Sequence, residues 1–334
     1  MPTDQLTDKI YGCLLGGLIG DAMGAPTEGM HYEQIIEQYG PDGVTDFEGV
    51  GTDDTAIRGQ LIDAIYKSDG HPTVDHFAQS FKDFKEQNRH LWFIPVRNAF
   101  HKYEQGLELP AYAGWGNMQS SSTAMAISPM GIINACNPRQ AVLETLDVAS
   151  FIHHGGNSGY CRDAACSMAA AVAASFDANA TIESVVDGAT RYLLPVSAGA
   201  LKQAIAEALD LAAESSSYET FRERYYATYQ RTVLADSMET IPATLAILTM
   251  SGGDPVRAIT WSANFGRDAD TIATMVGSIV GALHGASGLP SAWVAKVEAN
   301  PAVTYREDTR KLAQVVLQRI EESRQTAAAV EALG

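Results

Sequence analysis

The sequence has few cysteines, little positive charge and no long apolar run. Its four cysteines lie in mostly apolar segments without a Cys-x-x-Cys pair, which argues against a disulfide framework or a zinc site. The 40 acidic side chains outnumber the 23 basic ones, and a net charge of −17 disfavours binding to nucleic acid or to anionic membranes. The apolar runs are too short or too interrupted to span a bilayer, and no secretion signal opens the chain. We therefore expect a cytoplasmic protein.

The sequence also lacks a linker. No Ser/Gly/Pro-rich stretch, charge block or low-complexity run divides the 334 residues, so we predict a single domain over residues 1–334. Sustained period-two alternation is almost absent, which disfavours β-strands, whereas helical periodicity recurs along the chain. The pattern predicts an all-α fold built from many helices.

Two apolar segments carry glycine at every fourth position, from Gly12 to Gly24 and from Gly277 to Gly285. Residues four apart share one helix face, and glycines on that face let a neighbouring backbone approach closely. We therefore predict two tightly packed helices. Other helices should start where a Ser, Thr, Asn or Asp precedes an apolar period. These starts are expected at Thr73, Asn137, Thr181, Ser197, Thr220 and Asp254.

Two clusters of oxygen donors stand at the mouths of predicted helices. Each contains two aspartates and one threonine, and together they comprise Thr52, Asp53, Asp54, Asp268, Asp270 and Thr271. An Asp-x-Asp pair alone more often caps a helix. Two acidic helix starts brought together unpaired would repel each other, so a shared site implies cations between them. Oxygen donors alone favour Mg²⁺ or Mn²⁺ over zinc.

With these motifs, the sequence resembles the ADP-ribosylglycohydrolases. The resemblance begins in residues 12–24, passes through residues 52–54 and is densest over residues 254–293. It implies that family's compact orthogonal multi-helix bundle and the hydrolysis of an ADP-ribosylated substrate. In the family, the Thr-Asp-Asp and Asp-x-Asp-Thr residues hold two divalent ions. The resemblance thus implies two Mg²⁺ ions, or Mn²⁺, on Thr52, Asp53, Asp54, Asp268, Asp270 and Thr271.

The resemblance extends to other site residues. Glu28 matches an acidic position that approaches the metals in some members, and we take Glu28, Asp53 and Asp54 as candidate catalytic carboxylates. Asn117 is a candidate substrate-binding residue in residues 114–125, a stretch that could line a cleft or form a surface loop. This stretch departs from the family's motif over residues 118–123. His153 matches a histidine near the substrate ribose or adenine, or else caps a helix.

Two further charged residues have open roles. Asp21 either anchors the structure or lies near the site, and we favour the anchor. Arg267 stands where the commoner family motif has glycine. It either offsets the acids by pairing with Asp268 or Asp54, or binds an anionic group of the substrate, and we favour substrate binding.

Such a metal centre suits hydrolysis at the anomeric carbon of a ribose, where water captures an oxocarbenium-like transition state. No Ser-His-Asp or Cys-His arrangement competes for this role. The expected partner is an ADP-ribosylated protein or a small ADP-ribosyl or ribosyl compound, and the oligomeric state is left open. A hydrolase of a small N-riboside is the first alternative. A non-enzymatic crystallin-like or ADP-ribose-binding protein is the second, and the intact ligand set argues against it.

Overall fold

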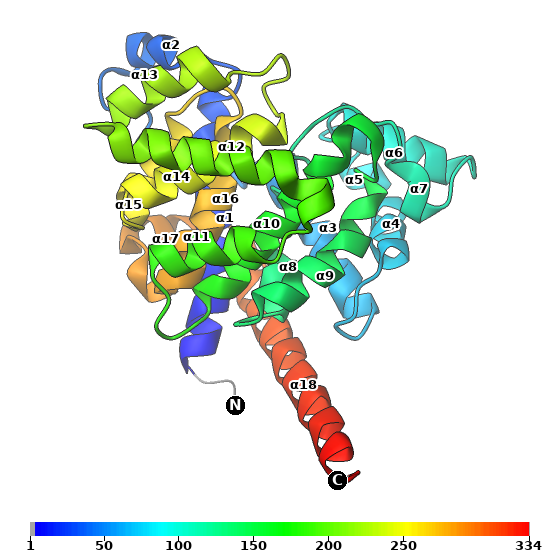
Figure 1. Cartoon of the computed structure of the whole chain (residues 1–334). Coiled ribbons are helices and arrows are strands. Elements are labelled where there is room, and N and C mark those ends of the chain that lie inside the picture. Colours follow the sequence, from blue (N-terminus) through cyan, green and yellow to red (C-terminus); the bar gives the residue numbers. More distant parts are fainter. Residues whose placement is uncertain (1–3, 334) are drawn as a thin grey trace.

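The computed structural model describes residues 4–333, and this part of the chain contains helices and no β-strand (Figure 1). The all-α prediction is confirmed. The α-helices are α1 (Asp4–Gly24), α2 (Tyr32–Tyr39), α3 (Asp53–Lys67), α4 (Val74–Asp83), α5 (Lys85–Asn88), α6 (Ile94–Glu104), α7 (Pro110–Ala113), α8 (Ser128–Ile133), α9 (Pro138–Val148), α10 (Gly159–Ser175), α11 (Ile182–Arg191), α12 (Pro195–Glu214), α13 (Tyr218–Tyr229), α14 (Ser237–Met250), α15 (Pro255–Ala263), α16 (Ala269–His284), α17 (Ser291–Glu298) and α18 (Tyr305–Glu331). Short 3₁₀ turns cover Ala25–Thr27, Ala149–Phe151, Gly156–Ser158 and Ala286–Gly288.

The two glycine-spaced segments form α1 and α16, which pack against each other at the centre of the molecule (Figure 1). A Cβ placed on Gly16 would lie 2.1 Å from the carbonyl oxygen of Gly277, and a Cβ on Gly277 would lie 2.1 Å from that of Gly16. Only glycine allows backbones to approach this closely. The predicted close packing is confirmed.

The α1–α16 pair is antiparallel, and this direction positions the acidic residues. Gly12 faces Gly281 near one end of the contact, and Gly24 faces Asp270 at the other. The end of α1 therefore lies beside the start of α16. Residues just before and after Gly24 are brought to the acidic helix start, although almost the whole chain separates them in sequence.

Most predicted helix starts are confirmed. The side chains of Asn137, Thr181 and Asp254 accept backbone hydrogen bonds at the starts of α9, α11 and α15, and Thr73 forms a capping box at α4. The starts predicted at Ser197 and Thr220 are wrong. Helix α12 begins earlier, at Pro195, whose fixed φ suits a first turn. Helix α13 begins at Tyr218, because Ser217 accepts the hydrogen bond from the Thr220 backbone N–H.

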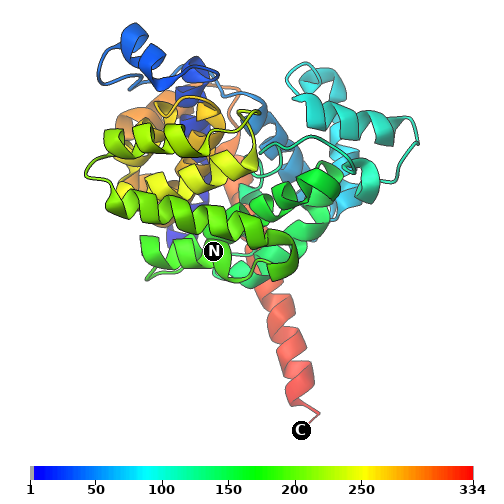
Figure 2. The ribbon, with the colours of Figure 1, turned by 45° about the horizontal axis from the view of Figure 1, so that its top comes forward.

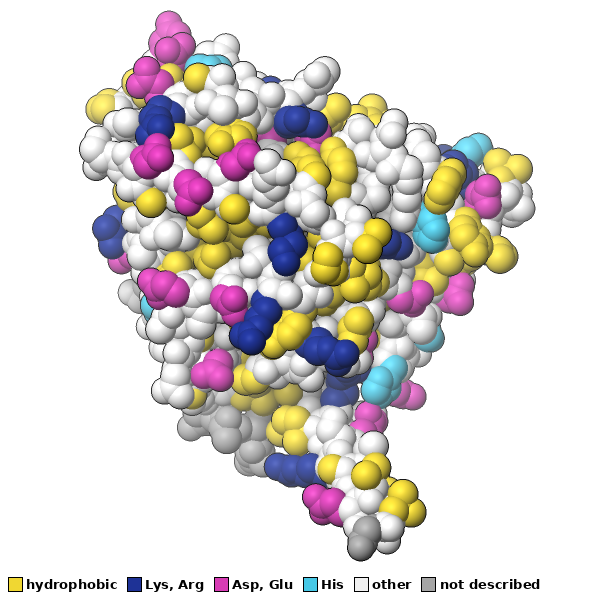
Figure 3. Space-filling view, in the orientation of Figure 1, with side chains coloured by type: hydrophobic (Ala, Val, Ile, Leu, Met, Phe, Trp, Pro, Cys, Tyr) yellow, Lys and Arg dark blue, Asp and Glu magenta, His cyan; other side chains and the backbone are white. Residues whose placement is uncertain are grey.

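Two features extend from the body of the molecule. The last helix, α18, is buried at its start and then projects away into solvent in both views (Figures 1 and 2). The lobe of α6 and α7 carries apolar side chains on its surface, among them the exposed Leu107, Leu109 and Tyr112 (Figure 3). Over residues 4–333, no helix combines the length and the hydropathy that crossing a membrane requires.

Candidate metal centre

Carboxylates from four segments converge where the end of α1 meets the starts of α3 and α16. Carboxylate oxygens of Asp21, Asp54 and Asp270 lie within 4.8 Å of one another, and so do those of Glu28, Asp268 and Asp270. The two groups of three share Asp270. The structure thus brings together acids from both sequence clusters in two adjacent groups.

The helix starts present these acids without using them as caps. At α3, the Oγ1 atom of Thr52 accepts a hydrogen bond from the Asp54 backbone N–H at 3.4 Å, so threonine is the capping side chain. At α16, Asp268 occupies the capping position, but its side chain makes no capping hydrogen bond. The carboxylates are therefore left facing one another rather than satisfying the helix ends.

Buried carboxylate oxygens in this cluster lack hydrogen-bond donors. Among the described residues, Asp54 Oδ1, Asp268 Oδ2 and Asp270 Oδ1 have no partner, and the exposed fractions of the three residues are 1%, 4% and 3%. An ionised oxygen buried without a donor is strongly destabilising. Divalent cations would satisfy these oxygens, and the all-oxygen donor set fits Mg²⁺ or Mn²⁺.

The acidic side chains also hold protons more tightly than usual. Burial, followed by the charges of neighbouring acids, raises the pKa values of Asp54, Asp268 and Asp270 well above their ordinary range. Burial, helped by the charges of Asp21 and Glu28, raises the pKa of Asp53 to about 7. Without a counterion, the cluster would therefore retain protons near neutral pH.

Asp21 holds the first acidic loop in place. Its carboxylate accepts hydrogen bonds from the backbone N–H of Thr52 at 2.9 Å and of Thr55 at 3.0 Å, and from the Thr55 hydroxyl at 2.5 Å. The anchoring role favoured from the sequence is seen, and Asp21 also lies within one of the two acidic groups. The structure therefore gives Asp21 both of the roles that the sequence left open.

Sequence reasoning missed Arg58, a fully buried cation behind the acids. It donates from Nη2 to the Tyr305 hydroxyl at 2.7 Å and to Thr55 Oγ1 at 3.2 Å. Through Thr55 it joins the hydrogen bonds of Asp21. The available signal was its position four residues after Asp54 on an otherwise apolar helix face.

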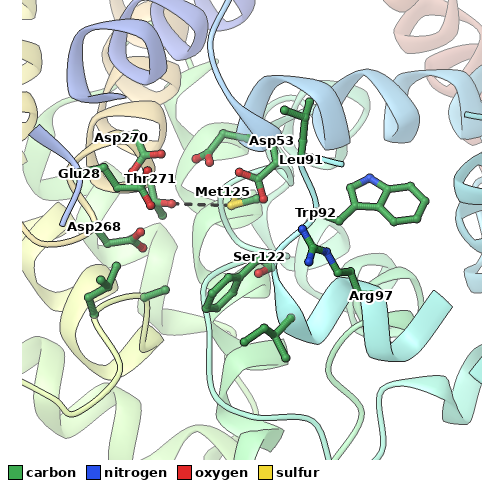
Figure 4. Close-up of a pocket in the computed structure, with 15 residues that line it drawn as sticks. Glu28, Asp53, Leu91, Trp92, Arg97, Ser122, Met125, Asp268, Asp270 and Thr271 are labelled. Carbon is green, nitrogen blue, oxygen red and sulfur yellow. Dashed lines mark hydrogen bonds between the residues drawn. The ribbon is translucent and has the colours of Figure 1, made fainter. Parts of the chain in front are cut away.

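A cavity of about 300 Å³ opens beside the acidic cluster. Figure 4 shows Glu28, Asp268, Asp270 and Thr271 on one side and Trp92 and Arg97 on the other. The lining residues are Glu28, Asp53, Asp54, Leu91, Trp92, Phe93, Ile94, Arg97, Ser122, Met125, Leu234, Ala235, Asp268, Asp270 and Thr271. The segment 91–97 was not predicted, because mostly apolar residues before a helix carry no sequence signal for a site.

Asn117 and His153, expected to bind substrate, do not line this cavity. Asn117 is buried, and its amide nitrogen donates to the carbonyl oxygens of Pro95 at 2.9 Å and Ile152 at 2.8 Å. His153 is fully buried against the hydroxyls of Ser120 and Thr123, and burial lowers its pKa to about 3. Their polar groups are engaged by the protein. The hydrogen bonds of Asn117 and His153 hold in place the loop whose residues Ser122 and Met125 line the cavity.

Arg267 also lies outside the cavity lining. Its guanidinium forms a two-pronged pair with Glu239, at 2.7 Å from Nε and 2.9 Å from Nη2, and Nη2 also donates to the Arg231 carbonyl at 2.6 Å. Its carboxylate partner is Glu239 of α14 rather than the predicted Asp268 or Asp54, and its binding to substrate stays a prediction. Its φ of 61° lies in the left-handed region, which glycine adopts without strain.

The chain is similar to known proteins over nearly its whole length. A model of the family described as ADP-ribosylglycohydrolase matches residues 2–326. The chain belongs to the ADP-ribosylglycohydrolase family. The chain is 24% identical over 352 residues to mouse ADP-ribosylhydrolase ARH3, covering 94% of this chain and 92% of that protein. It is 26% identical over 332 residues to the ADP-ribosylarginine hydrolase Tri1 of Pseudomonas putida, covering 95% and 80%.

The chain is also similar to two proteins whose names specify no substrate. The YegU protein of Escherichia coli is 23% identical over 335 residues, covering 94% of this chain and 98% of that protein. A solved structure described as an ADP-ribosylglycohydrolase-related protein complex matches with a TM-score of 0.66 at 19% identity, over 94% of this chain and 98% of that one. The structural match shows that the fold is shared. Family and relatives together support a hydrolase.

Proposed function

We propose that this ADP-ribosylglycohydrolase cleaves the bond between the anomeric carbon of a ribose and the acceptor group of an ADP-ribosylated substrate, with two divalent cations. The acceptor belongs to a protein or to a small molecule. The observation that carries the proposal is the pair of carboxylate groups sharing Asp270, in which buried oxygens lack donors. The similarity to the ADP-ribosylhydrolase ARH3 and the ADP-ribosylarginine hydrolase Tri1 supports the choice of substrate class.

The ligands proposed for the two cations are Thr52, Asp53, Asp54, Asp268, Asp270 and Thr271, with Mg²⁺ or Mn²⁺ as the ion. When bound, such ions lower the pKa of water and stabilise negative charge that develops in the transition state. Asp21 fixes the position of Thr52 through its backbone hydrogen bond. The preset loop then presents Asp53 and Asp54 without further rearrangement.

Hydrolysis also requires a group that accepts a proton from water. In the proposed reaction, the water oxygen bonds to the anomeric carbon and the electrons of the glycosidic bond leave with the acceptor. A carboxylate takes the proton from water and gives it to the departing acceptor. Glu28 is exposed at the cavity beside Asp268 and Asp270, which suits it to this role. Asp53 lines the cavity outside both groups of three, and it is the second candidate base.

A product screen tests the proposal. The purified protein would be incubated with ADP-ribosyl-arginine and ADP-ribosyl-serine peptides, small ADP-ribosyl compounds and simple N-ribosides, with Mg²⁺, with Mn²⁺ or with a chelator. We expect free ADP-ribose to be released from an ADP-ribosyl compound in the presence of a divalent ion and not with the chelator. Turnover of simple ribosides alone, or turnover that the chelator leaves unchanged, would contradict the proposal.

A further inference from the structure

Arg97 is the cationic side chain in the lining of the described cavity, where it stands with five carboxylates. It belongs to the first turn of α6, which begins at Ile94 beside the cavity. In Figure 4 its guanidinium extends from this helix to lie between Trp92 and Ser122, across the cavity from Asp268 and Asp270. The positive end of the α6 dipole is at the same place.

The Arg97 guanidinium has no carboxylate partner within 4.0 Å among the described residues. Its one hydrogen bond is a long one, 3.3 Å from Nη2 to the carbonyl oxygen of His90, and the side chain is exposed. Two other arginines are engaged by the protein: Arg267 is paired with Glu239, and the buried Arg58 donates to Tyr305 and Thr55. Arg97 therefore has donors left for a ligand, in the planar arrangement that suits an oxyanion.

The charge of the cavity explains why such a cation is needed. The five lining carboxylates repel an anionic substrate, and the proposed ions would sit at the acidic side rather than beside Arg97. A substrate that carries only hydroxyl groups would gain nothing from an arginine at this place. A substrate with a phosphate away from its reacting carbon would gain a charge-assisted hydrogen bond.

We propose that Arg97 binds a phosphate group of the substrate and so makes this cavity select phosphorylated ribosyl compounds over unphosphorylated ribosides. The inference rests on the proposed function, since it places the reacting ribose at the acidic cluster. It transfers to Arg97 the anion-binding role that the sequence suggested for Arg267. Arg97 is then a specificity-determining residue that takes no part in proton transfer.

Calorimetric binding measurements test this role apart from catalysis. ADP-ribose, ribose 5-phosphate and ribose would each be titrated, in Mg²⁺, into the wild-type protein and the variants Arg97→Ala, Arg97→Lys and Arg89→Ala. Arg89 is an exposed arginine eight positions earlier that does not line the cavity, so it controls for the loss of one positive charge. A circular dichroism melt of each variant would verify that it folds.

We expect Arg97→Ala to bind ADP-ribose on the order of ten to a hundred times more weakly, as the loss of a charged hydrogen bond implies. Arg97→Lys should recover part of this loss, and Arg89→Ala should bind like the wild type. If Arg97→Ala loses affinity for ADP-ribose alone, Arg97 binds the diphosphate. If the variant also loses affinity for ribose 5-phosphate, Arg97 binds a phosphate next to the ribose.

Three results would overturn the inference: unchanged ADP-ribose affinity in Arg97→Ala, an equal loss of affinity for ribose, or an equal loss of ADP-ribose affinity in Arg89→Ala. The proposed function fails in a different way. Phosphate-dependent binding through Arg97, combined with no release of ADP-ribose in the product screen, would support the phosphate site and contradict the hydrolytic function.

Discussion

At the scale of single residues, Asp270 occupies the central position of the acidic cluster. Its carboxylate belongs to both groups of three, and one of its oxygens is buried without a donor among the described residues. Each of the other acids belongs to at most one group. Any cation held by either group would therefore contact Asp270, whereas loss of another acid would leave one group intact.

We predict that Asp270→Asn loses turnover and Mg²⁺ affinity by roughly a hundredfold or more, because an amide replaces a charged oxygen in both groups. The metal-free variant should melt at a higher temperature than the metal-free wild type, since a buried repelling charge has gone. Activity assays, Mg²⁺ titrations and thermal melts measure these effects. Asp42→Asn, the same change at an exposed position, is the control. Wild-type Mg²⁺ affinity in Asp270→Asn would contradict the two-group arrangement.

The candidate ligands could be chosen from the sequence because each lies in a compact motif at a helix start. The hydrogen-bond partners of Asp21 and Arg58 could be assigned only from the structure, since they lie tens to hundreds of residues away. The same is true of Arg97, which becomes a site residue because α6 begins beside the acidic helix starts. For Asn117 and His153 substrate binding stays a prediction: the sequence does not reveal which way a side chain points, and in the structure their polar groups bond to protein atoms.

At the scale of helices, the antiparallel contact of α1 with α16 places the acids. The spacing of the glycines predicted that each of these helices packs closely against a neighbour, because a four-residue repeat places small residues on one helix face. That the two helices pack against each other came from the structure. Helix starts with a local capping side chain were also predictable. The starts of α12 and α13 were not, since proline and an earlier serine compete with Ser197 and Thr220 for the capping position.

We predict that Gly277→Ala lowers the free energy of unfolding by about 1–3 kcal/mol or more, because its Cβ would meet the Gly16 carbonyl oxygen. Gly199→Ala is the matched control, since it lies in α12, is exposed and has no atom within 4 Å of a new Cβ. That variant should gain about 0.5–1 kcal/mol from its higher helix propensity. Urea unfolding of both variants provides the comparison. Equal effects would show that the α1–α16 contact is looser than described.

At the scale of the whole molecule, the buried acids link stability to pH and to metal. Burial raises the pKa of Asp53 from 3.8 to about 7, so the metal-free protein should lose stability as pH rises from about 4 to about 7. Burial lowers the pKa of His153 from 6.5 to about 3, so its contribution has the opposite sign and is lost as pH falls below 6.5. His153 contributes equally with and without metal, so it cancels when the two states are compared.

We therefore predict that Mg²⁺ raises the melting temperature more at pH 7.5 than at pH 5.5, because binding requires deprotonated carboxylates and displaces their protons. Thermal melts with Mg²⁺ and with a chelator at the two pH values measure the difference. The Asp270→Asn variant should show little Mg²⁺ effect at either pH. The same Mg²⁺-induced shift at both pH values in the wild type would show that its binding site does not titrate in this range.

We propose that the acidic cluster around Asp270 holds two divalent cations. Calorimetric titration of chelator-treated, dialysed protein with Mg²⁺ or Mn²⁺ tests this claim most directly, because it counts the bound ions without requiring a known substrate. We predict saturable binding of two ions per chain, with both the affinity and the stoichiometry reduced in Asp270→Asn. Absence of saturable binding, or two ions that still bind normally to Asp270→Asn, would contradict it.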